Sequence, residues 1–371
     1  MRGGALIVVR AVAVAIFALA AWPRTASAQT PASDADLRRY LDDARFRRAA
    51  LERSLTTRST SYAAERLHRY ASGDALDWDR RPAWNPSVAV GGETPRPLAI
   101  PADRTTSAAV DHVDRAAFTA LGAEAFARYP AQLAPYLQHS VDGAVRVELP
   151  DGAGWALSCA SCHVRRAGRA RIVGAGNDTL DLGALMRPRQ AWGPGRVDVS
   201  SPDGDDPQRI PDLRSIRWLS HLQHGVAVAQ SDEIALAIRL ETLIITAHGG
   251  AVRPPREVAL GLALYLWSLA DTLPPVAAKP PPAFTRHCAA CHRPPHLTGP
   301  PIAAAQTHAD PAHALRPERS HGIYRVPSLR GVSTRGPLLH DGTAPDLATV
   351  LTHFHLNATD HQAILSYLSR L

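Results

Sequence analysis

The sequence predicts an all-α fold in which two related domains follow an N-terminal helical extension. Three observations lead to this prediction: apolar residues recur at helical spacing in several stretches, a Cys-x-x-Cys-His motif occurs twice, and a second short pattern follows each copy of that motif. The chain has 371 residues, of which 45% are hydrophobic. It is therefore long enough to form two or three domains with apolar cores.

Residues 1–28 are typical of a secretory signal peptide. Arg2 supplies positive charge, an apolar run extends from Ala5 to Trp22, and Ala26-Ser27-Ala28 offers a small-x-small cleavage site. An uncleaved membrane anchor is the alternative, because the run approaches the length that spans a bilayer. No later stretch of the sequence is as long and apolar. We therefore expect a periplasmic or otherwise exported protein without a stable membrane span after cleavage.

The positive charge of the chain is a weak indication of nucleic-acid binding. Removal of Arg2, Arg10 and Arg24 with the signal lowers the formal charge from +7 to +4. Nearly all the remaining basic residues are arginine, which can reflect coding composition as well as a phosphate-binding surface. We expect no nucleic-acid partner.

The N-terminal extension covers residues 29–110 in this interpretation. Apolar residues recur every three or four positions from Ala35 to Ala71, which predicts helix. Residues 76–106 are rich in Pro, Trp and Gly, so we expect an irregular segment there.

The first domain is assigned to residues 111–272, the Pro-rich linker to 273–282 and the second domain to 283–371. Residues 164–208 are rich in Gly, Pro and Asp, and an irregular stretch of this length is expected to wrap around something. Helices are predicted at 107–139 with a break near Tyr129-Pro130, and at 231–246, 256–271 and 360–371.

All four cysteines belong to the two Cys-x-x-Cys-His motifs, namely Cys159-Ala160-Ser161-Cys162-His163 and Cys288-Ala289-Ala290-Cys291-His292. Two thiols three positions apart on a helical turn can reach the two vinyl groups of one porphyrin, and the following histidine then lies under the iron as its proximal ligand. One such motif could also be a redox dithiol or half of a zinc site shared between the motifs. Two copies in an exported chain without other cysteines favour two covalent c-type haems.

A repeat supports two related domains around these motifs. Ile210-Pro211-Asp212-Leu213-Arg214 matches Val326-Pro327-Ser328-Leu329-Arg330, and a histidine stands thirteen residues after each proline, His224 and His340. Either histidine could hydrogen-bond a haem propionate, fix a turn or bind iron.

The sixth ligand of each iron is less clear from the sequence. Met186 could serve the first haem, but we favour a role as a gap-filling core residue. In small c-type domains the distal ligand precedes the final helix, which makes His248 the candidate in the first domain and His353 or His355 the candidate in the second. Trp192 and Trp218 could stand between the haems as an electron bridge, or simply pack in a core.

The stretch from Tyr324 to Val332, together with Pro337 to Thr343 and Leu347, resembles the second domain of bacterial di-haem cytochrome c peroxidases and MauG-like proteins. The resemblance covers residues 285–371 well and 155–272 in outline, and it leaves the extension out. It implies two tandem all-α cytochrome c domains, with His163 and His292 as proximal ligands and, as in relatives, a possible calcium ion between the domains.

The chain also departs from that family. Phe354 stands about where the family has its distal Met or Tyr for the second haem. Phenylalanine cannot bind iron, so the neighbouring His353 and His355 become the candidate distal ligands. The family's Asn-Pro-x-Glu-Met segment, which supplies an acid for peroxide cleavage, is absent, and Glu233 and Glu241 are the nearest acids. No catalytic residue is therefore assigned.

Three functions remain open at this point. The chain could be a di-haem electron carrier, a peroxidase or MauG-like oxidase with one open haem, or a non-catalytic haem subunit or sensor whose extension binds a partner. A small redox protein or a quinone-linked donor would supply the electrons.

Overall fold

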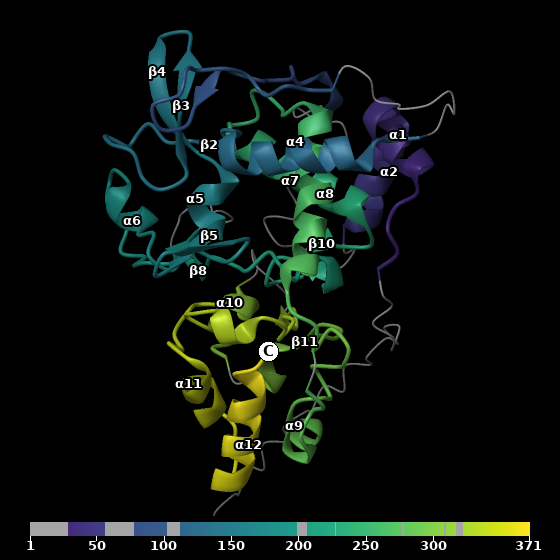
Figure 1. Ribbon diagram of the computed structural model, residues 1–371, viewed down its shortest axis with the longest axis vertical. Helices are drawn as coiled ribbons and strands as arrows, with labels where there is room; N and C mark the ends of the chain where they lie inside the picture. The colour runs from purple at the N-terminus through teal and green to yellow at the C-terminus, as the bar shows by residue number, and fades with distance from the viewer. Residues whose placement is uncertain are drawn as a thin grey trace, which may run out of the picture.

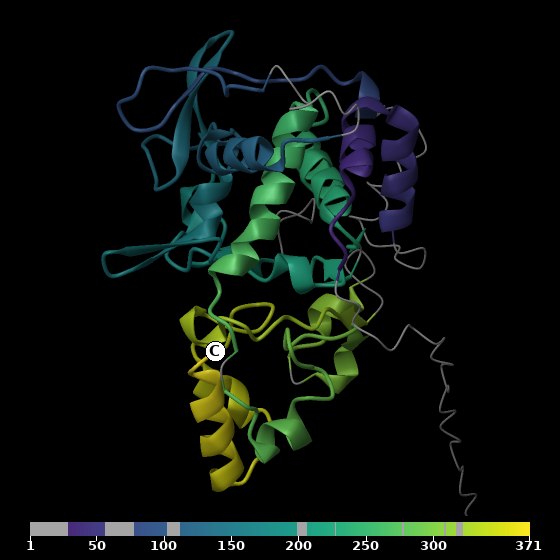
Figure 2. The ribbon, with the colours of Figure 1, turned by 45° about the vertical axis from the view of Figure 1, so that its right-hand side comes forward.

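The computed structural model shows two lobes stacked end to end, with the chain passing from one to the other through the Pro-rich linker (Figure 1). It describes residues 29–55, 78–101, 112–198, 206–226, 228–276, 278–307, 309–316 and 322–371. The expected signal peptide and the second half of the helix expected at 35–71 lie outside these residues. Residues up to about 272 form the larger lobe, and those from 282 onward form the smaller one (Figure 2).

The start of the extension is helical, as predicted, and it is part of the core of the larger lobe. Helices α1 (Asp34–Asp42) and α2 (Ala44–Ser54) are capped by the side chains of Ser33 and Asp43. Leu37, Tyr40 and Leu51 are fully buried in the same core as the long helices that follow. This part of the extension therefore belongs to the first lobe.

The centre of the first lobe is a close crossing of two helices, α4 (Arg115–Arg128) and α8 (Arg256–Ser268). Gly122 meets Gly261 at the crossing, where a Cβ on Gly122 would lie 1.9 Å from the carbonyl oxygen of Gly261. Phe126 and Tyr265 pack edge to face beside it, with ring centroids 5.5 Å apart. Helix α7 (Glu233–Ala247) packs against α8, and α1 and α2 contact α7 as well. The helices predicted at 231–246 and 256–271 are thus confirmed.

The prediction of an all-α fold is wrong, because 39% of the described residues are helical and 15% are in strands. A four-stranded antiparallel sheet of order β1-β3-β4-β2 joins β1 (Val88–Ala89) of the extension to β2 (Gln132–Leu133), β3 (Ala144–Leu149) and β4 (Gly152–Leu157). Within β3, Val145 and Val147 are buried while Arg146 and Glu148 are exposed. This alternation is the signature of a strand with one buried face.

Short two-stranded ribbons interrupt the irregular stretch expected at 164–208 and the residues after it. They are β5 (Val164–Ala167) with β6 (Ala170–Val173), β7 (Arg196–Val197) with β8 (Gln208–Arg209), and β9 (His221–Leu222) with β10 (Val228–Ala229). Between them lie α6 (Leu182–Leu185) and the 3-10 turn η2 (Ile216–Trp218). The ribbons fold this long segment around the first Cys-x-x-Cys-His turn.

The second lobe repeats the helix crossing on a smaller scale. The helix before the motif, α9 (Pro282–His287), packs against the last helix, α12 (Ala358–Leu368), and Phe284 meets Tyr367 edge to face at 4.9 Å. The remaining elements are β11 (Ile302–Ala303), η4 (Ala304–Gln306), α10 (Ala312–Leu315), β12 (Ile323–Tyr324), η5 (Val332–Thr334) and α11 (Leu347–Thr352). Helix α12 matches the helix predicted at the end of the chain.

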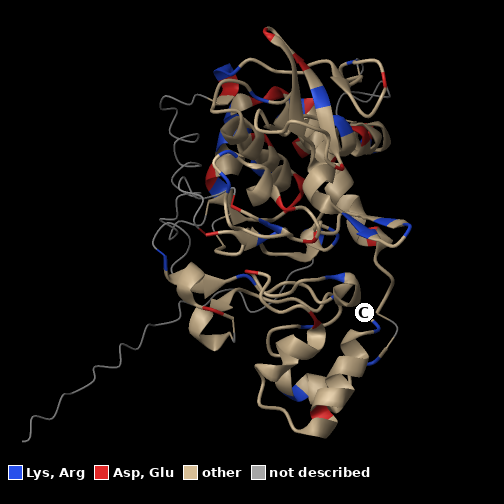
Figure 3. Ribbon diagram, turned by 90° about the vertical axis from the view of Figure 1, so that its left-hand side faces the viewer, with Lys and Arg blue, Asp and Glu red and all other residues tan. Residues whose placement is uncertain are grey.

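Acidic and basic residues are interspersed along the first lobe rather than separated by sign (Figure 3). Among the residues that the structure describes, no helix has the length and apolar character needed to cross a membrane.

Candidate functional site

The first Cys-x-x-Cys-His motif forms a single helical turn, α5 (Cys159–His163). Ser158 precedes it and donates its hydroxyl to the carbonyl of Gly143, 2.7 Å away. Asn177 closes the other side, because its side-chain amide donates to Ser161 O at 2.9 Å and its backbone N–H donates to Cys162 O at 2.8 Å. The turn that carries both thiols is therefore held by contacts from two distant segments.

His163 is oriented by the repeat. Its Nδ1 lies 3.0 Å from the carbonyl oxygen of Pro211, the proline of the first repeated pattern. Burial lowers the pKa of His163 to about 4, so the ring is neutral. Because a carbonyl can only accept, Nδ1 carries the proton and Nε2 keeps a free lone pair. This is the tautomer that a metal-binding imidazole requires.

His292 has the same arrangement in the second lobe. Its Nδ1 lies 3.1 Å from the carbonyl oxygen of Leu297, and the carbonyl of Pro327, the proline of the second pattern, is a further acceptor for the ring. Burial lowers the pKa of His292, which these carbonyls only partly oppose. The repeat seen in the sequence thus supplies, in both lobes, a carbonyl that fixes the histidine of the motif.

The four thiols are neutral and unbridged. Burial raises the pKa of Cys159 and of Cys162 to about 12, and that of Cys288 to about 11. A redox-active dithiol needs the opposite shift, because the thiolate is the reactive form. Within the described part of the chain, no cluster of three or more His, Cys, Asp or Glu side chains could hold a metal ion. The raised thiol pKa values do not favour the dithiol alternative.

A cavity of about 280 Å³ opens beside the second motif. Cys288, Cys291 and His292 line one part of it, while apolar side chains of α11 and the residues after it line another. Helix α11 lies across the lobe from α9 (Figure 1). A cavity with mostly apolar walls, two thiols and one free imidazole nitrogen fits a covalently attached haem.

One end of this cavity is strongly basic. Arg209, His224, Arg325 and His340 line it; we call them the interdomain quartet, because the first two come from the larger lobe and the last two from the smaller. Burial lowers the pKa of Arg209 and of Arg325 to about 10, so both guanidinium groups stay charged at neutral pH. Two buried cations at the end of an apolar cavity match a ligand with an apolar body and carboxylates at one edge, as a haem has.

The predicted distal candidates occupy three different environments. His248 caps α7 and its Nε2 lies 2.9 Å from the carbonyl oxygen of Pro130, while Trp84 packs edge to face on the ring at 4.9 Å. His353 lines the cavity of the second lobe next to Phe354, and His355 is exposed and is not among the residues that line that cavity. The structure therefore brings His353 near the second motif and gives the ring nitrogen of His248 another partner.

The surroundings of the first motif include two residues of note. Met186 packs in the same apolar cluster as Cys162 and Trp192, directly after α6. Tyr136 belongs to this cluster as well, and its buried hydroxyl has no hydrogen-bond partner among the described residues. Burial and the Cys162 thiol raise the pKa of Tyr136 to about 12. Sequence reasoning did not single out Tyr136, since a lone Tyr in a loop carries no pattern.

The two acids considered from the sequence have structural partners in the extension. Glu233 accepts hydrogen bonds from the backbone N–H of Ala32 and from Arg115, and Glu241 accepts one from the hydroxyl of Tyr40. Neither lines the cavity of the second lobe. At the boundary between the lobes, the carboxylate of Asp212 is paired with Arg214 and Arg335.

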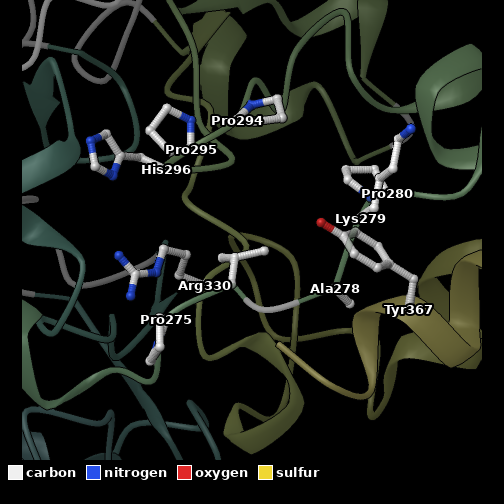
Figure 4. Close-up of a pocket in the computed structure, with 10 residues that line it drawn as sticks. Pro275, Ala278, Lys279, Pro280, Pro294, Pro295, His296, Arg330 and Tyr367 are labelled. Atoms are coloured by element: carbon white, nitrogen blue, oxygen red, sulfur yellow. The ribbon is translucent and has the colours of Figure 1, made fainter.

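A second cavity, of about 550 Å³, lies beside the linker (Figure 4). Its walls are prolines of the linker and of the loop after the second motif, together with His296, Arg330 and Tyr367. Arg330 donates to the carbonyls of Leu273 and Pro274 and lies over the ring of Trp218, 4.2 Å from its centroid. These contacts hold the linker in place, so we interpret this cavity as part of the lobe connection.

No protein-family model matches the chain, and no curated protein matches it.

Proposed function

We propose that the chain is an exported c-type cytochrome that carries one covalent haem on each Cys-x-x-Cys-His turn and transfers electrons. The observation that carries the proposal is the matched pair of histidines. His163 and His292 each follow two thiols spaced for thioether attachment, and each directs its Nδ1–H to a backbone carbonyl, which leaves Nε2 free. A bound haem supplies one-electron redox chemistry at its iron.

The protein supplies attachment, orientation and a low-dielectric surrounding. The neutral, partly buried thiols of each motif are placed for thioether bonds, and apolar residues of α11 line the second cavity. The interdomain quartet offers positive charge at one end of that cavity. In the first lobe, the apolar cluster that contains Cys162 and Trp192 provides the low-dielectric surrounding.

An aromatic contact joins the two lobes. The ring of Trp218 stacks on that of His296 at a centroid distance of 5.0 Å and an angle of 9°. Trp218 follows Pro211, whose carbonyl holds His163, and His296 follows His292 by four residues. We propose this stack as the route between the lobes, with a small redox protein or a quinone-linked donor supplying the electrons.

The proposal is tested by counting haems in variants of each motif. We expect two haems per chain by pyridine haemochrome when the full precursor is expressed with a cytochrome c maturation system. Replacing Cys159 and Cys162 with alanine should remove one haem, and so should the same change at Cys288 and Cys291. Ser161→Ala, which keeps the motif intact, is the matched control and should retain both. A wild-type chain without covalent haem would refute the proposal.

Peroxide reduction at the second haem is the alternative function that one observation favours. Phe354 lines the cavity where the resembling family has an iron ligand, and phenylalanine cannot bind iron. Among the described residues that line this cavity there is no Asp or Glu, so a histidine such as His353 would transfer the proton. A high-spin ferric signal that responds to peroxide would support this alternative, and two low-spin signals that persist on partial reduction would exclude it.

The alternative of a haem subunit or sensor with a partner-binding extension has less support. The part of the extension at 29–55 is buried in the first lobe through Leu37, Tyr40 and Leu51, so these side chains are not available to a partner.

A further inference from the structure

The interdomain quartet is built from equivalent positions of the two repeats. Arg209 stands two residues before Pro211, and Arg325 stands two residues before Pro327. His224 and His340 each follow their own proline by thirteen residues. The same two residue types from each lobe therefore meet at the boundary.

The two halves of the quartet hold each other reciprocally. The backbone N–H of Arg209 donates to the carbonyl of His340 at 2.9 Å, and the backbone N–H of Arg325 donates to the carbonyl of His224 at 2.9 Å. The imidazole rings of His224 and His340 lie edge to face, with centroids 6.4 Å apart. This exchange is the pattern of an interface between two related units with approximate twofold symmetry.

The quartet has donors in excess of acceptors. Among the described residues, the Arg209 side chain donates to the carbonyl of Leu339 and the Arg325 side chain to that of His221, and neither pairs with a carboxylate. The buried Nε of Arg325 has no hydrogen-bond partner in that part of the chain. Buried cations and unmade hydrogen bonds are costly, which points to an anionic ligand at this end of the cavity.

Resting on the proposed function, we propose that the quartet binds the propionate carboxylates of the second haem, and that the first lobe supplies half of this site. Arg209 and Arg325 donate charge-assisted hydrogen bonds from opposite sides. The second haem is then held by both lobes at once, although it is attached through cysteines of only one. The motif alone does not indicate this, because the residues lie outside the Cys-x-x-Cys-His segment.

Arg209→Gln is the decisive variant, and the chain offers a close control. Arg196 is the cross-strand partner of Arg209 in the β7–β8 ribbon and also reaches the second lobe, through Gly342, but it does not line the cavity. Arg196→Gln thus removes the same charge from the same ribbon. Two readouts are used on holoprotein shown to contain two haems: the midpoint potential of the second haem, and its propionate-bending band in resonance Raman spectra.

We expect Arg209→Gln to lower the midpoint potential, because removing a cation disfavours the added electron. A tenfold change in the redox equilibrium constant corresponds to about 59 mV for a one-electron couple, and we expect at least that shift. The Raman band should move as well, while Arg196→Gln leaves both readouts near wild type. Arg325→Gln should reproduce the effect from the other lobe, and Arg209→Lys should restore most of the potential.

Equal effects of Arg209→Gln and Arg196→Gln on both readouts would overturn the proposal, even with two haems attached. If Arg209→Gln does not fold, Arg325→Gln replaces it, and its effect on both readouts is compared with that of Arg196→Gln. A wild-type chain that lacks the second haem would instead refute the proposed function itself, so the two failures are distinguishable.

Discussion

Replacing Gly122 with alanine should destabilise the first lobe, because the backbones of α4 and α8 touch at this residue. The added Cβ would lie 1.9 Å from the carbonyl oxygen of Gly261 and 2.8 Å from the Cβ of Tyr265, whereas real Cβ contacts under 3.0 Å essentially never occur. The helices would have to separate by about an ångström, since backbone atoms cannot rotate away as a side chain can.

Overpacking a core typically costs about 1–3 kcal/mol and sometimes more. Alanine gains about 1 kcal/mol over glycine in a helix interior. A clash this severe belongs at the upper end of the range, so we expect a net loss of about 2 kcal/mol or more. For a domain of this size, that loss lowers the melting temperature by roughly 4–8 °C.

Thermal unfolding followed by circular dichroism measures the effect, with Gly92→Ala as the control. A Cβ on Gly92 meets nothing within 4 Å, so that variant should melt close to wild type. Equal melting temperatures for Gly122→Ala and Gly92→Ala would refute the argument from helix contact.

Three further changes test other contacts. Tyr40→Phe removes the buried hydrogen bond to Glu241 and should cost about 1–3 kcal/mol in urea unfolding, and a change no larger than that of Tyr265→Phe would contradict this. Burial would raise the pKa of Asp34, but hydrogen bonds from Arg115 and His112 outweigh burial and lower that pKa. The stability that these hydrogen bonds add is therefore present above about pH 4 and is lost as the pH falls further. Asp34→Asn should reduce this loss of stability at acid pH in a pH series of unfolding curves. Trp218→Leu removes the stack on His296 and should slow electron equilibration between the haems after flash reduction, whereas an unchanged rate would exclude the proposed route.

The helices were predictable because long amphipathic or apolar patterns dominate them. Helices α7, α8 and α12 lie within one to three residues of most of the boundaries expected from spacing alone. The sheet was missed because the alternating pattern of β3 covers only six residues, and one of its two partners, β1, is a two-residue strand distant in sequence. Local periodicity cannot reveal a strand whose stability depends on such pairing.

The candidate site was predictable in part. The Cys-x-x-Cys-His turns and the repeat are local in sequence, and the prolines of the repeat turned out to hold the histidines of the motifs. The quartet and the hydrogen bond from His248 to Pro130 join residues more than 100 positions apart, which spacing cannot show. The arginine two residues before each proline was nevertheless visible in the sequence as part of the repeat.

Peptide-level mass spectrometry of the exported chain tests the central claim most directly. We predict two haem-bearing peptides, one containing Cys159 to His163 and the other Cys288 to His292, each with the mass of one haem added through both thiols. Unmodified thiols, or a disulfide within either motif, would contradict the account.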